Sequence, residues 1–502
     1  MLFNSLHFLI FFPVVTAAYF MLPTLRARNM MLLVASYYFY MQYKPEYAIL
    51  MLISTLIDYL AANGMAKAKD NKAYKNFCLC MSLVGNLGML FFFKYFNFFN
   101  RNVATLLSFF NVPYQPLSLD ILLPVGISFY TFQTLSYTID VYRGDIEAER
   151  DFFTFALYVS FFPQLVAGPI ERSTNLLPQF YRYYDFDAKR VSSGLRLMLF
   201  GFFKKVVIAD RLAVIVNTVY NNYTSYNGVY YIIAAVAFAY QIFCDFSGYS
   251  DIARGCARIM GFELMVNFER PYYSKSVTEF WRRWHISLST WFRDYLYIPL
   301  GGSRKGYIRT LLNLFIVFLV SGLWHGASWT FVVWGALNGI AIVFEKIVGI
   351  GKRAGKKDYM EKKALERHQK PFYIRLLSFA GGLIPLALTF VFINFTWVFF
   401  RAQTLEQAFY MLPRFLEGLN AFNLKEFLST RMILGLDYWE FFTAIISVGL
   451  LELVHLFQSV ASPSKVLGRM PAIARLAVYA FCLSLVIWLA WTESQTFIYF
   501  AF

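Results

Sequence analysis

The chain has 502 residues, of which 58% are hydrophobic and only 15% are charged, whereas soluble domains average roughly 45–50% and 25%. Aromatic residues reach 20% and the mean hydropathy is +0.49. A soluble fold cannot bury this much apolar surface, so the composition excludes soluble globular, disordered and disulfide-stapled secreted proteins. It predicts an all-α polytopic membrane protein.

The charges are concentrated in a few places. Lys and Arg exceed Asp and Glu by 46 to 30, a net charge of +16. Three stretches between apolar runs, 63–76, 275–309 and 346–370, carry +3, +5 and +6 of it. Short basic loops are typical of the cytoplasmic side of a membrane protein, where anionic lipid attracts them. We therefore expect membrane lipid, and not nucleic acid, as the partner of these charges.

The first predicted span covers about 4–22 and is followed by Arg26 and Arg28. A cleaved signal peptide has the opposite charge order, so we expect a retained span with the N-terminus outside the cytoplasm. Further spans are predicted near 30–43, 46–62 and 77–99. They bring the basic 63–76 loop to the cytoplasmic side, in agreement with its charge.

The middle of the chain is less regular. Residues 121–141 and 152–170 are apolar but contain Pro and Gly, which predicts re-entrant pieces around an internal cavity. Spans near 191–218 and 229–262 follow, and the second contains Asp245, Ser247 and Asp251 in a polar cluster. We expect this cluster to interrupt the span. It is either a helix break with Asp and Ser caps or a functional group of ionisable residues at depth.

A histidine-bearing helical stripe is predicted within 279–295. Trp281, His285, Leu288 and Phe292 recur at helical spacing. Arg282 and Arg293 should project from a different face, toward water or phosphate. The segment is thus predicted to be one amphipathic helix, either folded into the protein or lying at the membrane surface with an incidental histidine.

Residues 310–345 are apolar and have strongly basic flanks on both sides. As one helix they would extend about 54 Å, against about 30 Å for the hydrocarbon core. The segment should therefore enter the membrane and return, turning at 321–328, the sequence SGLWHGAS. A charged imidazole at His325 would be costly there, so we expect a neutral ring able to act as a general base beside a cavity. The alternative is a core histidine bonded to a backbone carbonyl.

The last spans are predicted near 372–400, 439–459 and 472–491, which places the C-terminus outside. We expect a single membrane domain over 1–502. Its parts would be N-terminal spans (1–120), a catalytic core with both histidines (121–345), a basic cytoplasmic loop (346–370) and C-terminal spans (371–502). The five cysteines lack zinc-site spacing, and no nucleotide-binding motif is present. We therefore expect transfer of a pre-activated group, with no metal and no resident cofactor.

Several segments resemble the membrane-bound O-acyltransferase (MBOAT) family, and the closest branch is the alginate O-acetyltransferase type. They are FWRRWHISLSTWFRDYLY (280–297), LWHGASW (323–329), FFPQLVAGPIER (161–172), FCDFSGYSD (243–251) and FIYFAF (497–502). The resemblance implies a bundle of about 10–13 spanning helices, with re-entrant and interfacial helices, around a central tunnel. It also implies that His325 is the principal catalytic residue and His285 its partner. Weaker candidates for donor or tunnel contacts are Trp324, Arg282, Arg283, Trp284, Asp245, Ser247 and Asp251.

The resemblance further implies a bacterial cytoplasmic-membrane enzyme that moves an acetyl group from an activated cytoplasmic donor, with acetyl-CoA expected. The acceptor would be an exported cell-envelope polysaccharide, reached through a separate extracytoplasmic transferase. D-alanyl transfer or lipid O-acylation is the alternative within the same chemistry. A transporter or flippase, with buried His and Asp marking a substrate path, is the alternative outside it.

Overall fold

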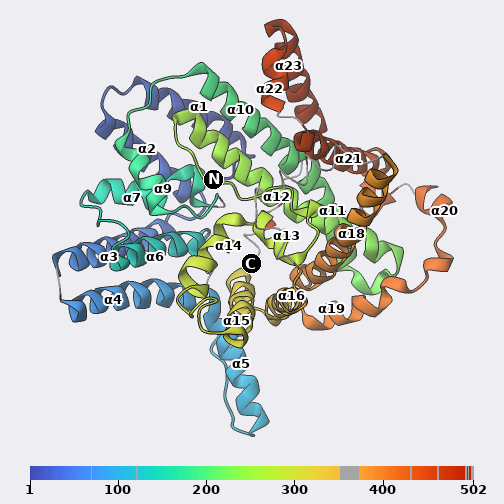
Figure 1. The fold of residues 1–502 in the computed structure, drawn as a ribbon, viewed down its shortest axis with the longest axis horizontal. Helices are drawn as coiled ribbons and strands as arrows, with labels where there is room; N and C mark the ends of the chain where they lie inside the picture. Colours follow the sequence, from blue (N-terminus) through green and yellow to red (C-terminus); the bar gives the residue numbers. More distant parts are fainter. Residues whose placement is uncertain are drawn as a thin grey trace. The chain divides into compact units, whose positions relative to one another are not determined.

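A computed structural model describes residues 1–68, 71–119, 122–166, 168–350, 372–429, 432–460, 463–491, 495, 497 and 498. The basic loop predicted at 346–370 therefore lies outside the described residues from 351 onward, as does the end of the chain from 499. Helices make up nearly all of the regular structure, as the composition predicted (Figure 1). Contacts divide the chain into two compact units, 1–206 with 245–266 and 496–502, and 207–244 with 267–495. The expected organisation as one domain stays a prediction.

The first unit is built from the N-terminal helices. In chain order these are α1 (Leu6–Met21), α2 (Leu25–Met41), α3 (Tyr47–Lys67), α4 (Lys72–Leu90), η1 (Phe91–Tyr95), α5 (Phe96–Phe109), α6 (Ile127–Arg143), α7 (Phe152–Ser160), α8 (Phe162–Leu165), α9 (Ser173–Leu176), η2 (Leu177–Tyr181) and α10 (Ala188–Phe202). Helices α3, α4 and α6 pack side by side (Figure 1). The short α7 and α8 show that the apolar run at 152–170 is broken, and the re-entrant pieces predicted there remain a prediction.

Two helices run across the division between the units. The π-helical segment η3 (Phe203–Ala209) continues α10, and α12 (Val229–Met260) is one unbroken helix. The predicted interruption at 245–251 is therefore wrong, because the polar side chains there find partners on η3 without leaving helical geometry. Within the first unit α10 and α12 approach through glycines. A Cβ on Gly201 would lie 2.7 Å from the Gly248 carbonyl oxygen. A Cβ on Gly194 would lie 2.7 Å from the Gly255 carbonyl oxygen.

The second unit holds the remaining helices. They are α11 (Asp210–Asn221), η4 (Tyr223–Ser225), η5 (Pro271–Tyr273), α13 (Val277–Arg283), α14 (Ile286–Phe292), η6 (Arg293–Tyr297), α15 (Tyr307–His325), α16 (Trp329–Val348), α18 (Phe372–Arg401), α19 (Leu405–Met411), η7 (Leu412–Leu416), η8 (Leu419–Ala421), α20 (Leu424–Ser429), α21 (Tyr438–Val460), α22 (Pro463–Arg469) and α23 (Ala472–Leu489). A two-stranded antiparallel hairpin pairs β1 (Met432–Ile433) with β2 (Leu436–Asp437).

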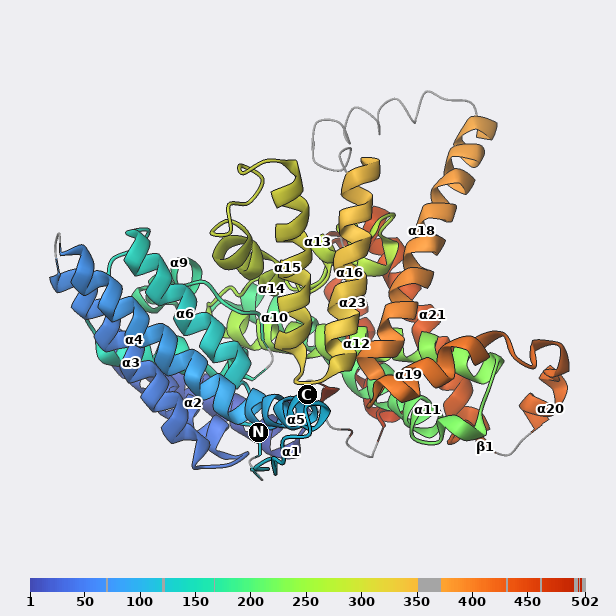
Figure 2. The same ribbon diagram turned by 90° about the horizontal axis from the view of Figure 1, so that it is seen from below.

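The turn predicted at 321–328 is confirmed, because 310–345 folds as a hairpin of α15 and α16. Helix α15 ends at His325, Ser328 caps α16 by accepting the Thr330 N–H, and the two helices pack side by side (Figure 2). They cross at Gly322 and Gly335, where a Cβ on either glycine would lie 3.2 Å from the other's Cα. This close crossing fixes the position of the end of α15, where His325 lies, relative to α16.

Eight described helical segments are long and apolar enough to span a membrane. They are 47–67, 72–109, 229–260, 307–325, 329–348, 382–401, 438–458 and 472–489, and α1 is a shorter apolar helix. The chain is therefore a multi-pass membrane protein, and the predicted 10–13 spans remain a prediction.

Candidate active site

A cavity of about 470 Å³ lies within the second unit, and it is lined by α13, α14, η6, α15 and α16. The four residues of the predicted stripe, Trp281, His285, Leu288 and Phe292, all line it. The other lining residues are Thr278, Arg282, Ser289, Arg293, Tyr297, Leu314, Val317, Phe318, Ser321, Ile342, Lys346 and Ile350. One cavity thus joins the stripe to the α15–α16 hairpin.

The stripe does not lie on one continuous helix as predicted. Helix α13 ends at Arg283, α14 begins at Ile286, and His285 between them has a φ of 44°. A left-handed conformation costs a residue other than glycine about 1–2 kcal/mol, so the surrounding structure must hold it. The break also brings Arg282 and Arg293 to the same cavity as the aromatic stripe. Both side chains are exposed, as predicted for groups directed toward water, but they line the same cavity as the stripe and do not lie apart from it.

Burial controls the protonation of the cavity histidine. The His285 side chain is buried, and desolvation lowers the pKa of its imidazole to about 3. Taking the ring out of water disfavours its charged form, so His285 is neutral at physiological pH. A neutral imidazole can both donate and accept a proton through its two nitrogens.

The second candidate histidine, His325, is also buried but is not among the described residues that line the cavity. Its ring is packed against three aromatic rings, with centroid distances of 5.0 Å to Trp324, 5.1 Å to Trp334 and 5.3 Å to Phe400. The Trp324 ring in turn lies 6.1 Å from the His285 ring. Trp324 therefore contacts both histidines, and Ser321, one turn before His325, is the cavity residue nearest to it in sequence.

Helix α16 holds α13 in place from one face. The Trp281 indole N–H donates to Asn338 Oδ1 over 3.1 Å. The buried Glu345 carboxylate accepts the backbone N–H groups of Val277 and Thr278, at 2.6 and 2.8 Å. These N–H groups begin α13 and have no partner inside the helix, so Glu345 satisfies them as a cap would. The helix that ends just before His285 is thus fixed at its start.

The basic lining residues are exposed, whereas His285 is buried. Arg282, Arg293 and Lys346 are exposed, and Arg293 pairs with Asp294 at 2.7 Å. The cavity therefore runs from solvent-accessible cations to a neutral imidazole. A ligand with an anionic end and a small reactive end matches this gradient.

The other two predicted residues of this region make structural contacts. Arg283 pairs with Glu279 at 2.5 Å. Trp284 is buried, stacks on Phe280 and packs against Trp397, with centroid distances of 5.4 and 5.1 Å. Neither Arg283 nor Trp284 lies among the described lining residues. A pattern of aromatic and basic residues could not distinguish them from Trp281 and Arg282, which do line the cavity.

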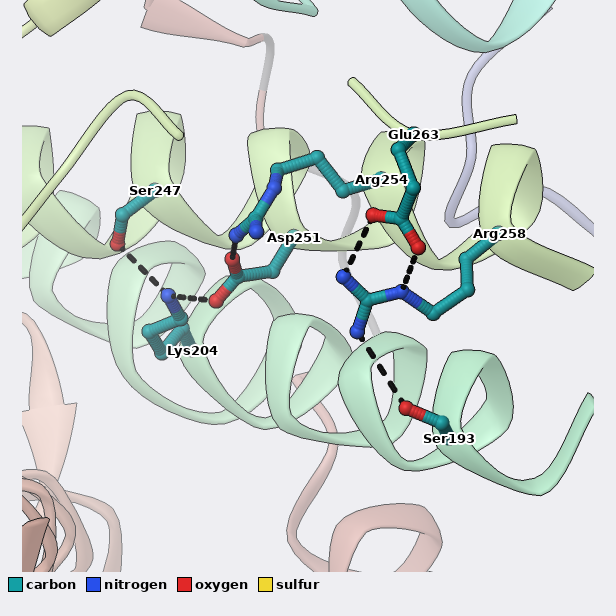
Figure 3. A network of polar contacts seen from close by, with 7 residues as sticks. All are labelled: Ser193, Lys204, Ser247, Asp251, Arg254, Arg258 and Glu263. Carbon is teal, nitrogen blue, oxygen red and sulfur yellow. Dashed lines mark hydrogen bonds and ion pairs between the residues drawn. The ribbon is translucent and has the colours of Figure 1, made fainter. Parts of the chain in front are cut away.

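The three polar candidates of 245–251 lie in the first unit and have basic partners from η3. Asp245 forms an ion pair with Lys205 at 2.7 Å, and both side chains are nearly inaccessible. Lys204 contacts both Asp251 and Ser247, at 2.6 and 3.0 Å (Figure 3). Buried charges need such partners to be tolerated. This pairing favours a structural role for the cluster.

Three further contacts lie around this cluster. Arg254 approaches Asp251 at 3.3 Å, and Arg258 binds Glu263 through two hydrogen bonds of 2.8 Å (Figure 3). The backbone N–H of Ile498 donates to Asp245 over 2.8 Å, which holds part of the C-terminal segment against α12.

Among the described residues, no group of three His, Cys, Asp or Glu is placed to hold a metal ion.

Sequence reasoning missed several residues of the cavity and its support. Lys346, Ser289 and Ser321 line it, while Glu345 and Asn338 support it from α16. Ser289 and Lys346 carry no motif of their own. Ser321 lies in the predicted turn, where His325 and Trp324 were singled out.

Comparison with known proteins agrees with this architecture. The family model for MBOAT, the membrane-bound O-acyltransferase family, matches residues 2–351, which include both histidines. The chain is 40% identical to a probable alginate O-acetylase AlgI of Pseudomonas syringae pv. tomato, over 81% of this chain and 74% of that protein. It is 34% identical to a peptidoglycan O-acetyltransferase of Helicobacter pylori, over 84% and 81%. A teichoic acid D-alanyltransferase of Bacillus subtilis is 26% identical, over 56% and 71%.

The family match covers more than half of the chain, and the relatives named as O-acetyltransferases match most of it. The eight apolar helices long enough to span a membrane, counted over the described residues, agree with a polytopic member of this family. The chain therefore belongs to the membrane-bound O-acyltransferase family and is a multi-pass membrane O-acyltransferase.

Proposed function

We propose that the protein transfers an acetyl group from a cytoplasmic thioester, acetyl-CoA, for O-acetylation of an exported cell-envelope polysaccharide. The observation that carries the proposal is the cavity that runs from exposed Arg282, Arg293 and Lys346 to buried His285. The cations suit the phosphates of the donor, and the buried end suits a small acyl group. The relatives named as alginate and peptidoglycan O-acetyltransferases support an acetyl group and a polymer acceptor.

The side of the membrane from which the donor enters is inferred from the charge distribution. The three basic lining residues fall in the 275–309 and 346–370 stretches, which the positive-inside rule assigns to the cytoplasm. The donor then enters from that side, in a bacterial cytoplasmic membrane with the N-terminus outside. A separate extracytoplasmic transferase delivers the group to the polymer.

In the proposed reaction the hydroxyl oxygen of the acceptor attacks the thioester carbonyl carbon. A C–O bond forms, the C–S bond breaks, and the thiolate leaves. His325, the base that the family resemblance implies, removes the hydroxyl proton, which then neutralises the thiolate, and such a base contributes roughly 10²–10⁴-fold in rate. His285 orients the donor or stabilises the carbonyl oxygen as negative charge develops. Transient acylation of His325 is the alternative route to the same product.

The test uses His325→Ala, with His7→Ala as the matched control. His7 lies in the other unit and forms a hydrogen bond with the Tyr38 hydroxyl. Membrane abundance and the acetate released from envelope polysaccharide by alkali are measured for both variants. We expect normal abundance for both and loss of polymer acetate only in His325→Ala. Normal acetylation by that variant would refute the catalytic assignment.

The donor and its side are tested in membrane vesicles. Inside-out vesicles, which expose the cytoplasmic face, should incorporate label from radiolabelled acetyl-CoA, whereas right-side-out vesicles should not. Label entering only from the other face would refute the proposed orientation. D-alanine esters instead of acetyl esters in the modified polymer would refute the proposed acyl group.

A further inference from the structure

The backbone around His285 is held by a segment that precedes it in the chain. The Glu269 N–H donates to the Arg283 carbonyl and the Ile286 N–H donates to the Asn267 carbonyl, each over 3.0 Å. These two hydrogen bonds lie on either side of His285. They fix both ends of the turn in which it adopts its positive φ.

The side chain of Asn267 adds a third contact. Its Oδ1 accepts the backbone N–H of Ser287 over 3.3 Å, and the residue is 1% exposed. The first N–H groups of any helix lack helical partners, and the residue before the helix normally supplies a side-chain acceptor. Here that residue is His285, which makes no side-chain cap hydrogen bond. Asn267 therefore supplies the cap for α14 that the imidazole does not.

We propose that Asn267 is a positioning residue for His285, which keeps the imidazole at the cavity wall by holding the start of α14. The inference rests on the proposed function, because it assumes that His285 acts on the acyl donor. Misplacement of a catalytic group by about 1 Å can lower a rate roughly 100-fold. The imidazole of an unheld His285 should leave the cavity wall as the strained turn relaxes.

The first arm of the test measures acetyl-CoA turnover, as free CoA released by inside-out vesicles, for the full chain and its variants. Asn267→Ala removes the acceptor, whereas Asn267→Asp keeps an oxygen at the same place. We expect kcat to fall roughly 10–100-fold in Asn267→Ala with the KM for acetyl-CoA nearly unchanged. Asn267→Asp should retain more turnover than Asn267→Ala, since it keeps an acceptor oxygen for the start of α14, but less than the wild type, because a carboxyl group is buried at this position.

A double-variant cycle separates positioning from general stability. His285→Asn removes the imidazole, and Asn tolerates the left-handed conformation better than most residues. In that background Asn267→Ala should have almost no further effect on turnover, because the group it positions is already absent. An equal loss in both backgrounds would overturn the proposal and assign Asn267 a purely structural role.

The second arm does not depend on activity. Hydrogen exchange of the 283–289 backbone is measured by mass spectrometry on the full chain in lipid nanodiscs. Asn97→Ala is the matched control, since Asn97 braces the Leu119 backbone in the other unit through two hydrogen bonds. We expect faster exchange at 286–287 in Asn267→Ala than in Asn267→Asp, and wild-type exchange in Asn97→Ala.

The two arms fail separately. If the wild-type vesicles do not consume acetyl-CoA, the proposed function falls, while the exchange arm still decides whether Asn267 holds α14. If the wild type is active but exchange at 286–287 is unchanged in Asn267→Ala, the positioning role is overturned and the function stands.

Discussion

Replacing Lys205 with methionine should strongly destabilise the first unit. The Lys205 ammonium and the Asp245 carboxylate are 2.7 Å apart, with side chains only 4% and 3% exposed. Methionine fills a similar volume but leaves the carboxylate buried without its counter-charge. Breaking a buried pair in this way costs about 3–5 kcal/mol of unfolding free energy.

Two further variants determine whether the loss comes from the unpaired charge. In Lys205→Met/Asp245→Asn the charge is gone and the Asn oxygen can still accept the Ile498 N–H. This double variant should recover all but about 1 kcal/mol. Lys204→Met should lower the unfolding free energy less than Lys205→Met does. Asp251, the partner of Lys204, is 16% exposed and still has Arg254 at 3.3 Å as a counter-charge.

The assay is unfolding of the purified protein in mixed micelles by increasing SDS, followed by tryptophan fluorescence, together with the amount of each variant in the membrane. A double variant as unstable as Lys205→Met alone would refute the reasoning. Polymer acetylation by a stable double variant also tests the competing hypothesis for Asp245. Loss of acetylation at normal abundance would favour a functional role of the 245–251 cluster over the structural one.

Three other predictions follow from the described contacts. Gly248→Ala should cost about 1–3 kcal/mol of unfolding free energy, because its Cβ would lie 2.8 Å from the Gly201 carbonyl oxygen, whereas Gly88→Ala, with nothing within 4 Å, should be neutral or stabilising in the same SDS titration. Because burial lowers the folded-state pKa of His285 to about 3, the contribution of this residue to stability should fall by about 1.4 kcal/mol per pH unit as the pH decreases below about 6.5, and His285→Asn should lack this contribution. Glu345→Ala, which leaves two N–H groups at the start of α13 without their acceptor, should lower kcat/KM for acetyl-CoA about 10-fold in vesicles, and Glu345→Gln should retain more activity. An unchanged kcat/KM in Glu345→Ala would contradict the bracing of α13 by α16.

The sequence predicts most of the fold for a simple physical reason. Long apolar runs must be helical in a membrane, since every backbone polar group needs a partner there. The α15–α16 hairpin was also predictable, because 310–345 is too long for one crossing and both of its flanks are basic. The interruption at 245–251 was predicted wrongly, because Lys204 and Lys205 on another segment supply the partners that a broken helix would otherwise need.

The site was predictable only in part. The helical spacing of Trp281, His285, Leu288 and Phe292 identified one wall of the cavity, and all four residues line it. The break at His285 was not visible, because its support comes from Asn267, through contacts that no local pattern encodes. Residues that act through hydrogen bonds between separate segments of the chain can be identified only in the three-dimensional structure.

The crossing of α15 and α16 limits how this enzyme could be redesigned for larger acyl groups. A Cβ added to Gly335 would collide with the Phe318 carbonyl oxygen, so the helix backbones meet there with no room for a side chain, and moving them apart would be costly. The Phe318 side chain, in contrast, faces the cavity. The cavity is therefore best enlarged by replacing Phe318 with a smaller residue, which leaves the crossing of the two helices unchanged.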